Sequence, residues 1–391
     1  MVSFMSMERR QELLAQARQD AEVLRQNADA ANRDRLMQPE VLRVLKKYYG
    51  LLVPVEYGGL GVDSVTYGLV LAELAKGDPS PALWLAMHGF AMSEAGRPEV
   101  SDEARRRVFE MGLRVPFSAA VSEVQSTGHL PQTFIPQNVT ARQLADGGYV
   151  LNGVKKVVTG YFQSDHLMVF ANLEGSEATT VCLIVPVGHP GMDEGEEWNS
   201  VGFMKSTRSN SVSFTNVKVG SEALVFTTDN FLTDAVVVYG VRTFGYMAAY
   251  LGIFERLFEL AVGLLKKRIP LGMTQSLSFD PLVATAIGTC HRKVTSARLL
   301  LTESLAAFDA KDPAAALCML HAKAAIGELV EEGVPMLIRQ IGLGGLSNPE
   351  VKRCLDDITV GSLMAPTSQM CALYGGCMVM GQDPAEIPSI R

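Results

Sequence analysis

The sequence lacks the features that mark several large classes of protein. None of the six cysteines stands in a Cys-x-x-Cys pair, so the pattern indicates neither a zinc site nor a disulfide framework. No uncharged apolar run reaches 18 residues, which argues against a membrane-spanning helix. The net charge is −7 and no basic block is present, so we expect no nucleic-acid partner. The six histidines are scattered, and nothing in their spacing supports a metal site.

The remaining composition is that of an ordinary globular protein. The chain has 391 residues, of which 48% are hydrophobic and 20% are charged, enough for two or three domains with a large core. The N-terminal stretch MVSFMSMERRQELLAQARQD is charged and has no apolar segment of the secretory kind. We therefore expect a cytoplasmic protein with reduced thiols.

The first part of the chain, residues 1–116, is predicted to be helical. Residues 8–27 are rich in strong helix formers, and Pro39 is placed to begin a second helix that ends near Gly50. Residues 64–78 repeat apolar side chains at helical spacing, with Asp63 or Ser64 as the N-cap.

The sequence pattern changes at about residue 117 and again at about residue 226. Residues 117–225 contain short runs such as YVLNGVKKVV and TTVCLIVPV, separated by Gly, Asn and Asp, which indicates a β-domain. Residues 226–391 return to long segments with a 3.6-residue apolar period and many Ala and Gly residues, typical of closely packed helices. The predicted class is α+β, with three domains in the order helices, strands, helices.

Four local strings in this order resemble the acyl-CoA dehydrogenase family. VPVEYGGLG at residues 53–61 is similar to its P-E-x-Y-G-G-x-G turn, and LNGVKKVVTG at residues 151–160 to its L-N-G-x-K-x-x-I-T-N strand. VGFMKSTRSNSVSFTNVKV at residues 201–219 and RQIGLGGLS at residues 339–347 resemble two further family motifs. The resemblance extends from about residue 8 to about residue 382.

The resemblance implies a fold and a cofactor. The family has an N-terminal α-helical domain, a middle β-barrel-like domain and a C-terminal four-helix bundle, and it binds FAD between the last two. It also implies a homodimer or homotetramer, because one arginine of the family reaches the FAD of a neighbouring subunit. We therefore expect FAD, and a homo-oligomer whose subunits share the cofactor site.

The positions that the family uses for flavin binding can be matched residue by residue. Ser122 and Thr159 correspond to hydroxyls at the edge of the flavin ring. Arg268 corresponds to the arginine on the FAD pyrophosphate of the neighbouring subunit, where a guanidinium suits phosphate oxygens. Four more positions match the adenosine side or the E-G-T-x-Q motif: Gln340, Gly344, Thr367 and Gln369. Each also has a plain structural interpretation, as a strand hydroxyl, a helix end or a turn, and it is their joint placement that favours FAD.

The catalytic position departs from the family. Its glutamate removes the α-proton of an acyl thioester while the flavin accepts a hydride from Cβ. Here the corresponding segment is MAPTSQM, with Ala365 in place of the glutamate. Some members carry the base just before an arginine early in the C-terminal domain, and here Val241 precedes Arg242. Both base positions are therefore empty. Glu123, Asp229 and Asp234 are the carboxylates that we considered as a relocated base, and Glu123 matches a structural glutamate of the family.

The substrate side has changed as well. Positions that contact CoA or cover the flavin in the family are occupied by other residue types, namely Gly128, His129, Val157 and Tyr239. Arg242 matches an arginine near the acyl pocket, and His88 lies on an apolar helix where the family often has a polar group. We take Arg242 and His88 as candidate substrate contacts.

Three functional interpretations stay open. The first is FAD-dependent oxidation of an acyl thioester held by CoA or by an acyl carrier protein, including oxidation at a hydroxyl or amine carbon. The second is ordinary α,β-dehydrogenation with a relocated base. The third is a catalytically silent subunit that pairs with an active homologue, or a binding protein. For an enzyme, the electrons would pass to a flavoprotein partner or to oxygen.

Overall fold

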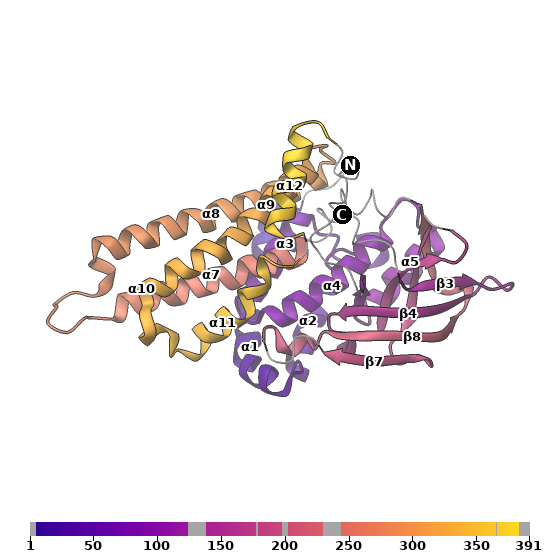
Figure 1. The fold of residues 1–391 in the computed structure, drawn as a ribbon, viewed down its shortest axis with the longest axis horizontal. Helices are drawn as coiled ribbons and strands as arrows, with labels where there is room; N and C mark the ends of the chain where they lie inside the picture. Colours follow the sequence, from indigo (N-terminus) through magenta and orange to yellow (C-terminus); the bar gives the residue numbers. More distant parts are fainter. Residues whose placement is uncertain are drawn as a thin grey trace, which may run out of the picture.

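The computed structural model describes residues 5–123, 138–176, 179–197, 202–229, 244–364 and 366–382. Its elements follow the predicted order of helices, sheet and helices (Figure 1). In that view the sheet domain occupies the right of the molecule and the long C-terminal helices extend to the left, with the N-terminal helices between them. The predicted architecture is therefore confirmed.

The N-terminal helices begin at the residues that the sequence signals mark. Asp63 is the N-cap of its helix, and its carboxylate accepts a hydrogen bond from the backbone N–H of Thr66 at 2.7 Å, which decides between Asp63 and Ser64. Pro39 begins the second helix, as expected for a residue that lacks an N–H. The helices are α1 (Met7–Asp34), α2 (Pro39–Leu45), α3 (Ser64–Ala75), α4 (Pro79–Ala95) and α5 (Asp102–Gly112).

The middle domain is one mixed sheet that carries a core on each side of its central strands. Strand β5 (His166–Leu173) shows why, because its side chains alternate: Leu167 and Val169 join one apolar cluster, and Met168 and Phe170 join another that includes residues of α4 and α5. The other strands are β1 (Phe117–Ala120), β2 (Ser122–Glu123), β3 (Thr140–Gln143), β4 (Tyr149–Val158), β6 (Thr180–Pro186), β7 (Met192–Glu197), β8 (Asn210–Val219) and β9 (Leu224–Thr228).

The main path through the sheet runs β7-β8-β4-β3-β5-β6-β9. Strand β1 pairs with β5, and β2 pairs with β4. Strand β4 therefore has neighbours on both sides, and its end, at Val158, leads directly into Thr159.

The C-terminal domain is built from long helices. They are α7 (Phe244–Lys267), α8 (Pro281–Asp309), α9 (Ala315–Glu328), α10 (Val334–Leu346), α11 (Pro349–Ile358) and α12 (Ser368–Val379). Between α9 and α10 the segment Leu329–Gly333 is a π-helix just before Pro335. Proline has no N–H to continue the α-helical pattern, so the wider turn falls where a regular bond cannot form.

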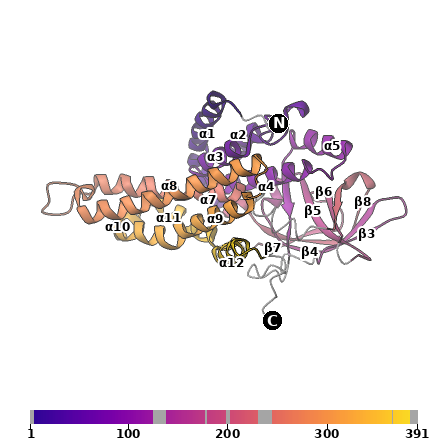
Figure 2. The same cartoon turned by 90° about the horizontal axis from the view of Figure 1, so that it is seen from above.

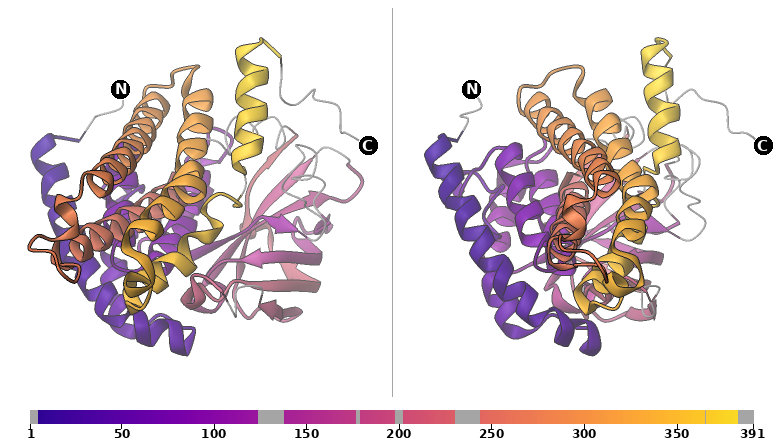
Figure 3. Two further views of the ribbon diagram at one scale, coloured as in Figure 1. Left: turned by 60° about the vertical axis from the view of Figure 1, so that its left-hand side comes forward. Right: turned by 90° about the vertical axis from the view of Figure 1, so that its left-hand side faces the viewer.

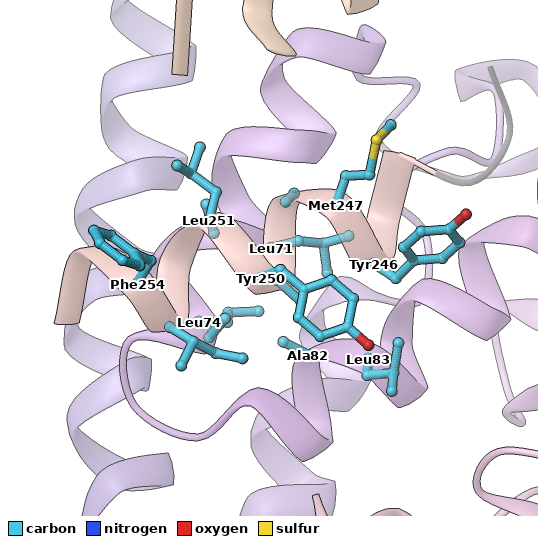
Figure 4. Packing of buried hydrophobic residues seen from close by; sticks show 14 of the residues in the cluster. Leu71, Leu74, Ala82, Leu83, Tyr246, Met247, Tyr250, Leu251 and Phe254 are labelled. Atoms are coloured by element: carbon cyan, nitrogen blue, oxygen red, sulfur yellow. The ribbon is translucent and has the colours of Figure 1, made fainter. Parts of the chain in front are cut away.

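Helix α7 joins the first and last domains through one core. Tyr250, Phe254 and Leu251 of α7 are fully buried and face Leu71, Leu74 and Ala82 of α3 and α4 (Figure 4). The same cluster includes residues of α8, α9 and α10. The N-terminal helices and the bundle therefore form one body, and α7 contributes to both.

The two ends of the C-terminal domain lie in different surroundings. Seen from above, the α10 end of the bundle projects far from the sheet (Figure 2). Helix α12, yellow in Figure 3, packs on α9 through Leu320, Met370, Cys371 and Tyr374. Among the described helices, none is long and apolar enough to cross a membrane.

The close approach of α7 to α3 gives a stability prediction. A Cβ on Gly252 would lie 2.2 Å from the carbonyl oxygen of Ala72, so the variant Gly252→Ala forces the helices apart. We expect a loss of about 1–3 kcal/mol in the free energy of unfolding, measured by chemical denaturation.

Gly263 on the same helix is the matched control, because a Cβ there meets nothing within 4 Å. Gly263→Ala should leave stability unchanged or raise it by up to about 1 kcal/mol. Equal effects of the two variants would contradict the packing explanation.

Candidate functional site

The predicted flavin-edge residues lie together where β2 meets β4. Ser122 pairs with Val157 across the two strands, and Thr159 follows two residues further along. Ser122 is exposed, Val157 is partly buried and Thr159 is 5% exposed. The structure therefore brings one accessible hydroxyl and one buried hydroxyl to the same corner of the sheet, beside a side chain of moderate size.

Thr159 is held from two sides. Its carbonyl oxygen accepts a hydrogen bond from the hydroxyl of Ser118, which is fully buried on β1. Its Oγ1 accepts a hydrogen bond from the Ser209 hydroxyl at 3.3 Å, and no residue in the described part of the chain accepts its own O–H, which is therefore available to donate. A fixed hydroxyl with a free proton suits an acceptor atom such as a ring nitrogen or carbonyl oxygen.

The turn after Thr159 depends on a glycine. Gly160 has φ +73°, and a Cβ there would lie 2.0 Å from the ring of Trp84. The Gly160 N–H donates to the carbonyl oxygen of Thr207 at 2.8 Å, while the Trp84 indole donates to Ser164 Oγ at 2.9 Å. The corner formed by Ser122, Val157 and Thr159, called the Thr159 corner below, is thereby fixed against α4 of the N-terminal domain.

A buried ion pair joins β2 to β4. Lys155 Nζ lies 2.5 Å from Glu123 Oε1, and both side chains are almost fully buried. Glu123 also accepts hydrogen bonds from the backbone N–H groups of Asn138 and Val139. Burial lowers the pKa of Lys155 to about 8, and the neighbouring carboxylate of Glu123 opposes that shift. Glu123 is thus engaged within the sheet, in line with the structural role expected for it.

A second group of predicted residues gathers at the far end of the bundle. Arg268 follows α7 and donates from its guanidinium to the carbonyl oxygen of Ile341 at 3.1 Å, which places it on the Gln340–Gly344 segment. Arg268 and Gly344 are exposed, and Gln340 is partly exposed. This end of α10 points away from the sheet that carries Thr159 (Figure 1).

The remaining cofactor candidates begin α12. Thr367 is the N-cap of that helix, and its side chain accepts a hydrogen bond from the backbone N–H of Met370 at 3.2 Å. Thr367 is buried, whereas Gln369 is exposed. The capping bond gives Thr367 a structural role, and the Gln369 side chain is accessible to a ligand.

His88 has no ring nitrogen left for a substrate. Its Nδ1 accepts a hydrogen bond from the Phe117 N–H at 3.2 Å, which leaves Nε2 to donate to the Tyr49 carbonyl oxygen at 3.0 Å. The side chain is 1% exposed, and burial lowers its pKa to about 4. His88 is a neutral core histidine that joins the first two domains, and we do not retain it as a substrate contact.

Several predicted positions lie outside the described residues. These are both base positions, the relocated-base candidate Asp234, the candidate substrate contact Arg242 and most of the remodelled substrate side: Ala365, Val241, Asp234, Arg242, Gly128, His129 and Tyr239. Asp229 is described, and its exposed carboxylate accepts a hydrogen bond from the Thr179 hydroxyl at 2.5 Å.

Two neighbours of Thr159 were missed in the sequence. Ser118 and Ser209 contact it from strand β1 and from the segment before β8, 41 and 50 positions away. No local pattern distinguishes these serines from others on strands, because their role comes from tertiary contact alone.

The residues of the two groups fit a flavin nucleotide. The Thr159 corner offers a hydroxyl donor and an accessible Ser122, which suit the polar edge of a flavin ring. The Arg268 end offers an exposed guanidinium, which suits phosphate oxygens.

Comparisons with known proteins identify the family. The profile of the acyl-CoA dehydrogenase N-terminal domain matches residues 7–110, and that of the acyl-CoA dehydrogenase C-terminal domain matches residues 242–373. Together they cover more than half of the chain, which therefore belongs to the acyl-CoA dehydrogenase family. This is a family of flavin-dependent oxidoreductases that bind FAD, so the predicted family and cofactor class are confirmed.

The similar proteins have different activities. A dibenzothiophene monooxygenase of Rhodococcus qingshengii is 30% identical over 174 residues, which is 43% of this chain and 40% of the monooxygenase. The match thus spans about two fifths of that relative's length. A 3-(aryl)acrylate reductase of Clostridium sporogenes is 22% identical over 354 residues, covering 88% of this chain and 90% of the reductase.

Solved structures agree on the fold. Butyryl-CoA dehydrogenase from Megasphaera elsdenii superposes with a TM-score of 0.85 at 19% identity, covering 97% of this chain and 100% of that one. FMN-bound TdsC from Paenibacillus sp. A11-2 gives 0.83 at 22% identity, covering 95% and 97%. At these identities the likeness supports the fold alone.

The buried ion pair gives a second prediction. The variant Lys155→Met leaves Glu123 buried without its cation, and we expect a loss of about 3–5 kcal/mol in the free energy of unfolding. The adjacent Lys156 is the control, because its pair with Glu196 is exposed and 3.7 Å long. Lys156→Met should cost at most about 1 kcal/mol. Thermal or denaturant unfolding of both variants measures the difference, and equal losses would refute the assigned role of the buried pair.

Proposed function

We propose that this protein is an FAD-dependent oxidoreductase that acts on an acyl thioester held by CoA or by a carrier protein. The observation that carries the proposal is the Thr159 corner, where a hydroxyl with a free proton is held by Ser118, Ser209 and the Gly160 turn. A buried, pre-oriented donor beside the accessible Ser122 suits the polar edge of a flavin ring, which supports the proposal.

In this proposal the chain's residues bind and orient the cofactor from two subunits. Ser122 and Thr159 of one copy face the ring, and Arg268 of a second copy binds the pyrophosphate. Bound FAD supplies a hydride acceptor. The bundle end around Arg268 also carries apolar side chains that are each at least 56% exposed, as at an interface: Ile269, Leu271, Met273, Phe279, Leu282 and Leu343.

The family's glutamate is absent from the two positions where it is expected, so proton removal must differ from the usual mechanism. Glu123 is neutralised by Lys155, and the Asp229 carboxylate is exposed to solvent. An alcohol or amine carbon is easier to oxidise under these conditions, because its O–H or N–H proton needs a weaker base than a thioester α-proton. We therefore favour oxidation at such a carbon over α,β-dehydrogenation.

The first test is an absorbance spectrum of the purified protein with FAD, followed by anaerobic addition of thioesters. We expect a bound flavin whose visible band bleaches with a hydroxyacyl or aminoacyl thioester of CoA or of a carrier protein. Bleaching by a saturated acyl-CoA would favour a relocated base instead. A flavin that no thioester bleaches would favour a silent subunit or the monooxygenase considered below, and a protein that binds no flavin would refute the proposal.

A monooxygenase is the second candidate, favoured by the similarity to the dibenzothiophene monooxygenase. A monooxygenase needs no α-proton base, which agrees with Ala365 and Val241 in the sequence. Supplying reduced flavin, oxygen and an aromatic heterocycle separates the candidates. A product that contains an oxygen atom from O₂ would establish the monooxygenase, whereas anaerobic bleaching by a thioester alone would exclude it as the main activity.

The shared site gives a further prediction. Arg268→Gln should weaken FAD binding by about 10- to 100-fold, because a charge-assisted hydrogen bond is lost. Lys267→Gln removes the same charge one residue earlier and should leave the dissociation constant within about twofold. Fluorescence titration of FAD measures both. A normal affinity in Arg268→Gln would show that this end of the bundle does not bind the cofactor.

A further inference from the structure

Beside the Thr159 corner lies a strained turn. Met204 and Arg208 both have left-handed backbone conformations, with φ of 45° and 44°, and the short helix Lys205–Thr207 lies between them. Neither residue is a glycine, so each conformation costs of the order of 1–2 kcal/mol. Such a turn persists only where surrounding contacts hold it.

The turn contacts Gly160 directly, and the residue after the turn contacts Thr159. The Thr207 carbonyl oxygen accepts the Gly160 N–H at 2.8 Å, and Thr207 Oγ1 donates to the Met204 carbonyl oxygen at 2.8 Å. Ser209, which follows the turn, is the residue whose hydroxyl donates to Thr159. A shift of the turn would therefore move the main chain and the side-chain partner of Thr159 together.

The contact that holds the start of this turn comes from another domain. Asp357, on α11, accepts a hydrogen bond from the Met204 N–H through Oδ1 at 2.6 Å. Its side chain is buried, and among the described residues its Oδ2 has no hydrogen-bond partner. A buried oxygen without a hydrogen-bond partner lowers the stability of the folded state, and an apolar side chain at this position would avoid that loss.

We propose that Asp357, in the C-terminal domain, is a positioning residue for the site of the flavin ring edge. Asp357 holds the Met204–Arg208 turn, and through that turn it holds Thr159. The inference rests on the proposed function, because it assumes that Thr159 faces a flavin. It makes the geometry of the ring-binding corner depend on the docking of the C-terminal domain onto the sheet.

The surroundings of Asp357 favour its neutral form. Burial, followed by the repulsion of Asp78 at the N-cap of α4, raises the pKa of Asp357 to about 7. Asp356 on α11 also raises this pKa, whereas Arg353 on the same helix lowers it. Burial, followed by the charge of Asp357, raises the pKa values of Tyr250 on α7 and Cys354 on α11, so neither group adds a charge at neutral pH.

The sign of the pH effect follows. The pKa of Asp357 is higher in the folded chain than in the unfolded chain, so the folded state binds more protons between about pH 4 and pH 7. The contribution of Asp357 to stability therefore falls as pH rises through this window. Above about pH 7 the carboxyl carries a buried charge near Asp78, which destabilises the fold, while the Met204 N–H favours that charged form.

The test compares two variants of Asp357 in the full-length protein loaded with FAD. Asp357→Asn keeps an oxygen that accepts the Met204 N–H, whereas Asp357→Leu removes it. We expect Asn to preserve the flavin absorbance spectrum and to abolish its change with pH around 7. We expect Leu to raise the FAD dissociation constant roughly tenfold and to shift the spectrum.

Asp309 supplies the matched control. It is another carboxyl of the C-terminal domain, and it accepts the Ser64 N–H at 2.8 Å at the start of α3, with a pKa that burial also raises. Asp309→Leu should lower the melting temperature and leave the flavin spectrum unchanged.

The outcomes separate this inference from the proposed function. If Asp357→Leu and Asp309→Leu have the same effect on the flavin, or if Asp357→Asn keeps the pH response, Asp357 is merely structural and the inference fails. If Thr159→Val leaves the spectrum of the wild type unchanged, the flavin does not lie at Thr159 and the proposed function fails first. Should Asp357→Leu not fold, the pH response of Asp357→Asn still decides.

Discussion

The whole arrangement depends on how closely α7 approaches α3 and α4. Gly252 lies against the main chain of α3, and the large side chains of α7, Tyr250 and Phe254, then fill the space around that contact. Because the same core continues into α8, α9 and α10, the first and last parts of the chain behave as one support. The sheet domain is attached to this support through the apolar cluster that it shares with α4 and α5, and through polar contacts.

Three of the polar contacts involve segments next to Thr159 or to its hydrogen-bond partners. Trp84 reaches Ser164 from α4, His88 joins Tyr49 to the start of β1, and Asp357 reaches Met204 from α11. The corner that faces the proposed flavin ring is therefore the place where three domains meet. Such a corner is rigid, which is what a site for a planar ring with a polar edge needs.

The sequence was sufficient for the elements and for the family. The apolar residues within 64–78 and along β5 reflect burial of nearly the whole helix and of both faces of the strand, and these are local properties. It also located Arg268 and the Gln340–Gly344 segment, which the structure brings into contact although no spacing rule requires it. His88 was misleading, because a polar residue on an apolar helix reads the same whether it meets a ligand or two main-chain groups.

What the sequence could not supply are contacts between distant segments. Asp357 and Met204 are 153 positions apart, and nothing in either neighbourhood signals the bond. The left-handed backbone of Met204 is equally hidden, since methionine has no preference for it. The residues that position a site are thus harder to predict from the sequence than the site residues, because their residue types are common ones.

A crystal structure of the oligomer with FAD tests the central claim most directly. The account predicts the flavin ring edge within hydrogen-bond distance of the Thr159 hydroxyl, and the pyrophosphate on Arg268 of a second copy. A flavin bound elsewhere, or one whose pyrophosphate lies far from every copy of Arg268, would contradict it.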